Sequence, residues 1–255
     1  MYNSFKVLYR KFLLQFSGID VSLYYRYNES RMKKILYHGS GKVIETPVFG
    51  SGNPHNDYGL GFYCTENREL AKEWASSGNE DGFVNKYEID LDGLAVCNLS
   101  EGYHILNWMA VLLENRTFDL SSAAAEMARD YILETFKPSY EDYDLIIGYR
   151  ADDSYFSFAK DFLNNSIPLE KLSEAMRLGK LGEQVVLKSR KAFGQLVFTG
   201  SEAVDNKIYY PKRMERDSMA RSEYRNSKSD FNILESKFII DIVREKWGND
   251  DERLR

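Results

Sequence analysis

The chain contains the stretch DYGLGFYCT at residues 57–65, which runs into ENRELAKEWAS at residues 66–76, and these two runs decide the fold. Two closely spaced glycines followed by aromatic residues indicate a short strand at residues 61–64. The second run has helical periodicity, with Thr65 placed to cap the helix and Trp74 on its apolar face. A strand that leads directly into an amphipathic helix is therefore the unit around which we arrange the other elements.

The rest of the chain alternates between strand and helix patterns. Further strands are predicted at residues 35–37, 83–91, 95–99, 143–149, 184–188 and 193–199. Further helices are predicted at residues 105–113, 122–136, 154–164, 169–178 and 231–246. A loop rich in Gly, Ser, Asn and Pro covers residues 39–56, and the tail from Lys212 is charged. This order of elements predicts an α+β fold.

Composition limits the classes of protein that fit. The chain has 255 residues, of which 43% are hydrophobic, and a formal net charge of -5, so it is a globular chain without a global field that recruits polyanions. Its two cysteines, Cys64 and Cys97, predict neither a disulfide framework nor a thiolate metal site. We expect no metal, no membrane partner and a cytoplasmic protein, since neither a leader pattern nor a run of ~18 apolar residues occurs.

The same patterns suggest how the chain is divided. Residues 1–31 are aromatic and basic and precede a second start-like Met32, so we treat them as an N-terminal extension. Residues 32–228 form the predicted domain. Residues 229–255 carry the amphipathic helix, which we expect to pack on or near that domain.

Two motifs resemble the ADP-ribosyltransferase superfamily. The run Gly59-Leu-Gly61-Phe-Tyr63, with a second aromatic, Trp74, eleven residues after the tyrosine, is similar to a motif of the branch that contains poly(ADP-ribose) polymerases and diphtheria toxin, known by its His-Tyr-Glu residues. Tyr37-His-Gly-Ser40 resembles the His-Gly element on the first strand of that branch. The resemblance implies a split antiparallel sheet core with inserted and C-terminal helices, and NAD⁺ as the substrate.

Residues 35–224 also resemble the bacterial family called domain of unknown function 3990. Its members share the YHGS and DxGxGFYxT motifs, and the pieces at residues 106–108, 149–153 and 181–184 follow in the matching order. Such proteins are often encoded beside small antitoxin-like partners. The resemblance therefore implies a toxin of a toxin–antitoxin pair, with an antitoxin protein as a partner.

The residue types suit the binding of NAD⁺, whose nicotinamide is a flat cation. Tyr63 and Trp74 supply two aromatic faces that can stack on it from opposite sides. His38 supplies a ring N–H for a ribose hydroxyl, and Gly39 leaves the backbone unobstructed beside the nicotinamide amide. Ser40 either adds a hydroxyl to this pocket or caps the turn. The resemblance adds Gly61 to the cofactor-binding set, although this glycine equally permits close strand approach.

The catalytic carboxylate is the departure from the superfamily pattern. Breaking the nicotinamide bond builds positive charge on the ribose carbon, which a carboxylate stabilises. In the superfamily a glutamate at the start of a late strand has this role, and Gln184 occupies the aligned position. Because successive strand residues point to opposite faces, only one of Glu183 and Gln184 can face the cleft. Asp152 and Asp153 are the other candidate acids.

These features support three hypotheses. The first is an NAD⁺-dependent mono-ADP-ribosyltransferase that acts on a protein or nucleic-acid acceptor, with Tyr63, Gln184 and Glu183 as catalytic candidates. The second is an NAD⁺ glycohydrolase, in which water replaces the acceptor. The third, motivated by Gln184, is a catalytically silent module that binds NAD⁺ or an ADP-ribosylated ligand.

Overall fold

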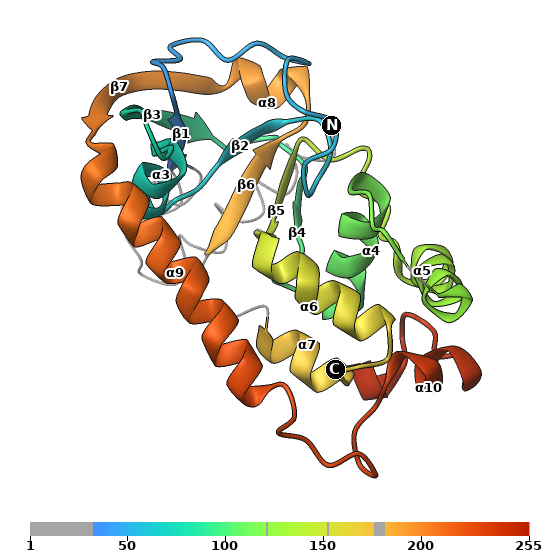
Figure 1. The fold of residues 1–255 in the computed structure, drawn as a ribbon. Helices are drawn as coiled ribbons and strands as arrows, with labels where there is room; N and C mark the ends of the chain where they lie inside the picture. The colour runs from blue at the N-terminus through green and yellow to red at the C-terminus, as the bar shows by residue number, and fades with distance from the viewer. Residues whose placement is uncertain (1–32, 121, 152, 176–181, 255) are drawn as a thin grey trace, which may run out of the picture.

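The computed structural model describes residues 33–120, 122–151, 153–175 and 182–254 (Figure 1). The extension predicted at residues 1–31 lies outside these residues. The described chain confirms the α+β class, with strands gathered into two sheets and helices around them. The strands are β1 (Lys33–Ser40), β2 (Phe62–Cys64), β3 (Gly82–Asp90), β4 (Val96–Asn98), β5 (Leu145–Tyr149), β6 (Glu183–Leu187) and β7 (Leu196–Val204).

The two sheets are a three-stranded one of order β1-β3-β7 and a four-stranded one of order β2-β6-β5-β4. Among the described residues, one isolated backbone bridge joins them, in which Tyr37 and Thr65 exchange N–H···O bonds of 2.8 and 2.9 Å. Strand β4 departs from the split antiparallel sheet core that the resemblance implies, because it pairs parallel to β5. A long helical crossover lies between these two strands in the chain, which is the connection that parallel pairing requires.

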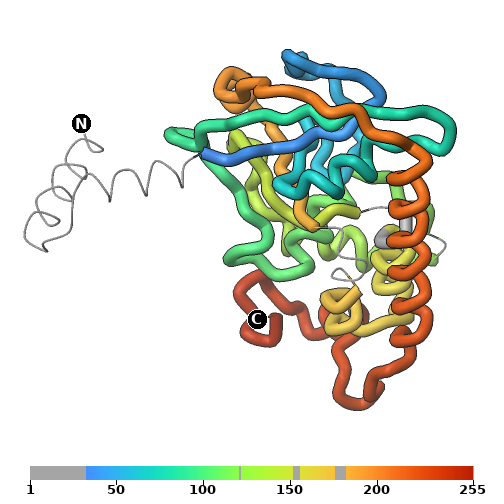
Figure 2. Tube along the Cα trace, turned by 90° about the vertical axis from the view of Figure 1, so that its left-hand side faces the viewer, coloured from blue at the N-terminus to red at the C-terminus, as the bar shows by residue number. Residues whose placement is uncertain are grey.

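The helices gather mostly beside the four-stranded sheet (Figures 1 and 2). They are α3 (Arg68–Ala75), α4 (Ile105–Asn115), α5 (Ala123–Phe136), α6 (Asp153–Leu163), α7 (Leu169–Ala175), α8 (Arg190–Gly194), α9 (Asn206–Ser227) and α10 (Ile239–Arg244). Helix α9 runs along one side of the molecule and packs against α3 and α6. Among the described residues, none of these helices is both long enough and apolar enough to cross a membrane.

The largest core cluster lies around α4, which is almost entirely buried. The C-terminal segment contributes to the same cluster through Ile239, Ile242 and Trp247, the last of which is fully buried. Tyr131 of α5 donates a hydrogen bond of 2.9 Å to the Trp247 carbonyl. The C-terminal segment is therefore part of the main core.

Several predicted boundaries differ from the structure. Helix α3 begins after Asn67, whose side chain accepts hydrogen bonds from the Glu69 and Leu70 amides, so Thr65 is not its cap. Instead, the Thr65 hydroxyl accepts from the Asn67 amide at 3.1 Å, which places it one step earlier in the turn. Thr65 and Asn67 are both residue types that cap helices. Asn67 determines the start of the helix because its side chain accepts from two helical amides.

Two late elements also differ. Phe193 lies in α8, which the Ser189 side chain caps, and β7 starts only at Leu196. The helix predicted over residues 231–246 is reduced to α10, because tertiary bonds hold the chain before it in an irregular path. The Lys237 carbonyl accepts from the Leu169 amide at 2.7 Å, for example.

Helix α3 lies unusually close to β1. A Cβ built on Gly39 would lie 2.0 Å from the Ala71 carbonyl oxygen and 2.6 Å from the Ala75 nitrogen. A real side chain cannot occupy that space, so the glycine allows the backbone of the helix to contact the strand. This contact fixes the position of Trp74, which is on α3.

We predict that Gly39→Ala lowers the free energy of unfolding by about 3 kcal/mol, because the clash is with backbone atoms that cannot rotate away. The matched control is Gly41→Ala, where an added Cβ meets nothing within 4 Å. Urea unfolding of both variants measures the difference. Equal stability of the two would contradict the close packing of α3 on β1.

Candidate functional site

A cleft of about 230 Å³ opens where the two sheets meet. It is lined by His38, Gly39, Asn56, Asp57, Tyr63, Trp74, Arg116, Arg150, Ala151 and Gln184. Five of these residues were predicted from the sequence, and they come from β1, β2, α3 and β6. The structure therefore brings most of the predicted site together, and it adds one acid and two arginines that the sequence analysis missed.

The imidazole of His38 is held by the neighbouring strand. Its Nδ1 lies 2.7 Å from the Tyr63 carbonyl oxygen, which can only accept, so Nδ1 carries the proton. Burial lowers the pKa of His38 from its ordinary value of 6.5, although the bond to Tyr63 opposes this shift. The neutral ring therefore has a lone pair on Nε2. The predicted donation of a ring N–H to a ribose is corrected, since Nε2 can only accept from a hydroxyl.

Tyr63 is fixed by its hydroxyl group. That hydroxyl donates to the Gly59 carbonyl at 2.6 Å and accepts from the Tyr58 amide at 3.1 Å. Burial raises the pKa of the phenol well above its usual range. The hydroxyl is therefore committed to the loop that precedes β2, and the aromatic ring is the part that Tyr63 offers to a ligand.

Trp74 already contacts a flat cation. The Arg150 guanidinium carbon lies 4.6 Å from the centre of its ring, in a cation–π contact. The indole Nε1 is buried and has no hydrogen-bond partner among the described residues. This face of Trp74 therefore already holds a planar cation. A ligand that stacks on the same face must displace Arg150.

The structure separates the two candidate residues at the start of β6. Gln184 is only 4% exposed and faces the cleft, where its Nε2 donates to the Asp57 Oδ2 at 2.8 Å. Glu183 is exposed and does not line the cleft. Asp152 lies outside the described residues, as does the side chain of Asp153. Gln184 is therefore the residue of the pair that lines this cleft.

Asp57 is the buried acid of the cleft and is 5% exposed. Its Oδ2 accepts from the Ala151 amide at 2.9 Å as well as from Gln184, and its Oδ1 lies 3.7 Å from Arg116 Nη1. Burial raises the pKa of this carboxyl, while those two hydrogen bonds and the charges of Arg116 and Arg150 oppose the shift. The sequence signal was weak, because an aspartate beside glycines is also an ordinary turn residue.

A buried polar network fixes the two walls of the cleft relative to each other. Trp108 of α4 donates from Nε1 to the Tyr58 hydroxyl at 3.0 Å and to the Tyr149 carbonyl at 3.1 Å. The Tyr58 hydroxyl in turn donates to the same carbonyl at 2.6 Å. Since Tyr58 follows Asp57 and Tyr149 precedes Arg150, this network holds the acid and the arginine in place.

Ser40 and Gly61 do not line this cleft in the part of the chain that the structure describes. The Ser40 hydroxyl donates to the Lys42 carbonyl at 2.7 Å, and so it closes the turn after β1. A Cβ on Gly61 would lie 2.6 Å from Val186 Cγ1, so this glycine allows β2 to approach β6. Gly39 does line the cleft, but the constraint seen on it is its contact with α3 rather than a collision with a ligand.

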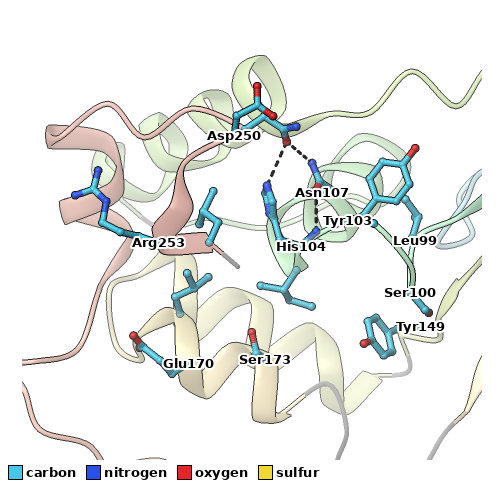
Figure 3. Close-up of a pocket in the computed structure, with 15 residues that line it drawn as sticks. Leu99, Ser100, Tyr103, His104, Asn107, Tyr149, Glu170, Ser173, Asp250 and Arg253 are labelled. Atoms are coloured by element: carbon cyan, nitrogen blue, oxygen red, sulfur yellow. Dashed lines mark hydrogen bonds between the residues drawn. The ribbon is translucent and has the colours of Figure 1, made fainter.

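A larger cavity of about 830 Å³ lies between the start of α4, α7 and the C-terminal segment (Figure 3). There the Asn249 Oδ1 accepts from His104 Nε2 at 3.2 Å and from Asn107 Nδ2 at 2.6 Å. These bonds hold the C-terminal segment against α4. Tyr149 also lines this cavity, and the next residue, Arg150, lines the smaller cleft.

Comparison with known families gives one match. The family model described as "Protein of unknown function (DUF3990)" matches residues 34–198, a range that includes every residue lining the smaller cleft. No curated protein and no solved structure matches the chain.

We predict that the His38 imidazole titrates below 6.5 and is neutral, with its proton on Nδ1, at pH 7. Two-dimensional ¹H–¹⁵N spectra recorded between pH 5 and 8 report both the pKa and the tautomer. The signal is assigned by its loss in His38→Gln. A proton on Nε2 at pH 7 would contradict the bond between Nδ1 and the Tyr63 carbonyl, and a pKa above the ordinary value would contradict the burial of the ring.

Proposed function

The chain belongs to the DUF3990 family, and we propose that it is an NAD⁺-dependent mono-ADP-ribosyltransferase with an ADP-ribosyltransferase-like fold. The observation that carries the proposal is the meeting of His38, Tyr63, Trp74 and Gln184 in one cleft. They come from four elements spread from β1 to β6. His38, Tyr63 and Trp74 are residues that carry the resemblance to the superfamily, and Gln184 occupies the position of its glutamate.

The arrangement of the sheets supports the proposed fold. Strand β1 carries His38 in one sheet and β2 carries Tyr63 in the other, and the two sheets meet at the bridge between Tyr37 and Thr65. A split sheet core with the cleft at the junction is what the resemblance implies. The parallel pairing of β4 lies at the far edge of its sheet and leaves the junction unchanged.

The nicotinamide end of NAD⁺ fits the Trp74 side of the cleft. A pyridinium is flat and cationic, as is the guanidinium that lies on the ring in this structure. Tyr63 offers a second aromatic ring that is already immobilised, so stacking on it costs little conformational entropy. In the proposed complex Arg150 leaves Trp74, and its charge then lies near the entering diphosphate.

The ribose fits beside His38 and Gln184. The neutral His38 Nε2 accepts a hydrogen bond from a ribose hydroxyl, and the Gln184 amide oxygen is able to accept another. In the reaction, the bond between ribose C1′ and the nicotinamide nitrogen breaks, and its electron pair neutralises the pyridinium. An acceptor nucleophile on a protein or nucleic acid then bonds to C1′ and releases its proton to solvent.

The direct test incubates the full chain with NAD⁺ labelled in its adenylate part, with and without a cell lysate. We expect nicotinamide release and transfer of the label to a macromolecule. Free ADP-ribose formed at the same rate without lysate would instead support a glycohydrolase, in which water is the acceptor. NAD⁺ binding by calorimetry without any release would support a silent binding module.

We predict that Trp74→Ala weakens NAD⁺ binding about fivefold to tenfold, the loss expected for one stacking contact of ~1 kcal/mol. Trp74→Phe keeps an aromatic face and should stay within about threefold of the wild-type Kd. Calorimetric titration with NAD⁺ measures both variants. If Trp74→Ala and the wild type bind NAD⁺ equally, nicotinamide does not stack on this ring.

A further inference from the structure

We propose that Asp57 supplies the negative charge that stabilises the ribose carbon during bond cleavage, and that Gln184 positions this carboxylate. The inference rests on the proposed function. It assigns the catalytic charge to a residue that the sequence alignment with the superfamily does not point to. The aligned position holds Gln184, whose amide is neutral, and the adjacent Glu183 is exposed outside the cleft.

Asp57 is the acid that the described structure places in the lining of the cleft. It lies on the same side chain network as Gln184, with 2.8 Å between Gln184 Nε2 and Asp57 Oδ2. The carboxylate is thus displaced by about one hydrogen-bond length from where an acid at position 184 would lie. Asp57 is only 5% exposed, and in such a poorly solvated position a charge at this distance still acts strongly on a developing cation.

The carboxylate is held in a defined orientation. The Ala151 amide and Gln184 Nε2 both donate hydrogen bonds to Oδ2 of Asp57. The neighbour recorded for Oδ1 is the Arg116 guanidinium at 3.7 Å, beyond hydrogen-bond distance. Oδ2 is therefore used for positioning. Oδ1 is directed toward the Arg116 guanidinium, and a cationic ligand can replace or supplement that guanidinium as its charged neighbour.

The orientation of Gln184 follows from its bond to Asp57. Because the amide nitrogen donates to the carboxylate, the amide oxygen is turned away from Asp57. This oxygen can accept a hydrogen bond from a ribose hydroxyl. A glutamine in this place does what an ionised glutamate cannot, since it donates to an acid and accepts from a substrate at once. The glutamine at position 184 and the acid at position 57 therefore work as a pair.

The reaction step balances without an added reactant. As the bond from C1′ to the nicotinamide nitrogen breaks, the electron pair leaves with nicotinamide and C1′ becomes positively charged. Asp57 stays ionised and stabilises that charge. The acceptor then forms its bond to C1′ and loses its proton to solvent, so Asp57 is unchanged after the cycle.

The first variant is Asp57→Asn, which keeps the shape and an oxygen for the Ala151 amide but removes the charge. We predict that kcat for nicotinamide release falls about 100-fold or more, as for the loss of one electrostatic transition-state contact. The Kd for NAD⁺ should stay within about threefold, and thermal unfolding should show a folded protein. Glu183→Gln is the matched control, and it should retain kcat within about twofold.

The second variant is Gln184→Glu, which recreates the superfamily residue. In our proposal it brings two carboxylates into contact, so one of them must bind a proton and kcat does not rise. A rise in kcat of about tenfold or more would overturn the proposal. It would show that the reaction needs a negative charge at position 184, which Asp57 does not replace. This variant also decides the matter if Asp57→Asn does not fold.

The outcomes separate this inference from the proposed function. If the wild type releases nicotinamide and Asp57→Asn keeps its kcat, Asp57 is not the catalytic charge, while the proposed function stands. If Glu183→Gln loses kcat instead, the charge belongs to Glu183. If the wild type neither binds NAD⁺ nor releases nicotinamide, the proposed function fails and the role of Asp57 fails with it.

Discussion

The backbone bridge between Tyr37 and Thr65 is the interaction on which the site depends. It is the junction of two sheets, made of two hydrogen bonds of 2.8 and 2.9 Å. Next to it, the His38 ring bonds to the Tyr63 carbonyl, so the histidine of one sheet is fixed against the tyrosine strand of the other. The glycine that follows His38 then lets α3 approach, and α3 brings Trp74 to the same cleft.

The small cleft is lined by a buried carboxylate and two arginines. Burying Asp57 is costly, and the bonds from Ala151 and Gln184 together with the charge of Arg116 offset part of that cost. The Arg150 guanidinium lies on the Trp74 ring, and its charge also favours the ionised form of Asp57. The carboxylate of Asp57 and the aromatic face of Trp74 suit the cationic ring of a ligand. The two arginines suit an anionic chain attached to that ring.

The motif piece at residues 106–108 lies outside the cleft but supports its geometry through the core. Trp108 lies on α4, yet its indole nitrogen ties Tyr58 to Tyr149, the residues adjacent to Asp57 and Arg150. Asn107, beside it, bonds to Asn249 and so fixes the C-terminal segment. Helix α4 thus supports the cleft on one side and the end of the chain on the other, which makes its burial a condition of the geometry of the site.

Elements whose signals are local could be predicted from the amino-acid sequence. The runs at residues 57–65 and 66–76 predicted a strand followed by a helix, and the apolar faces of α4 and α5 predicted these helices within two residues of their ends. Periodicity and capping act over a few residues, and so they can be read without the fold. The grouping of His38, Tyr63 and Trp74 was also inferred from the motifs.

Which side chains contact one another within that cleft depends on tertiary packing and could not be predicted from local patterns. Asp57 and Gln184 are 127 residues apart, and their bond exists because β6 packs beside β2 with Gln184 on the buried face. The proton on His38 Nδ1, the place of Arg150 on Trp74 and the exclusion of Glu183 from the cleft depend likewise on partners from other elements. Burial and strand register set these contacts, and neither exists until the two sheets have joined.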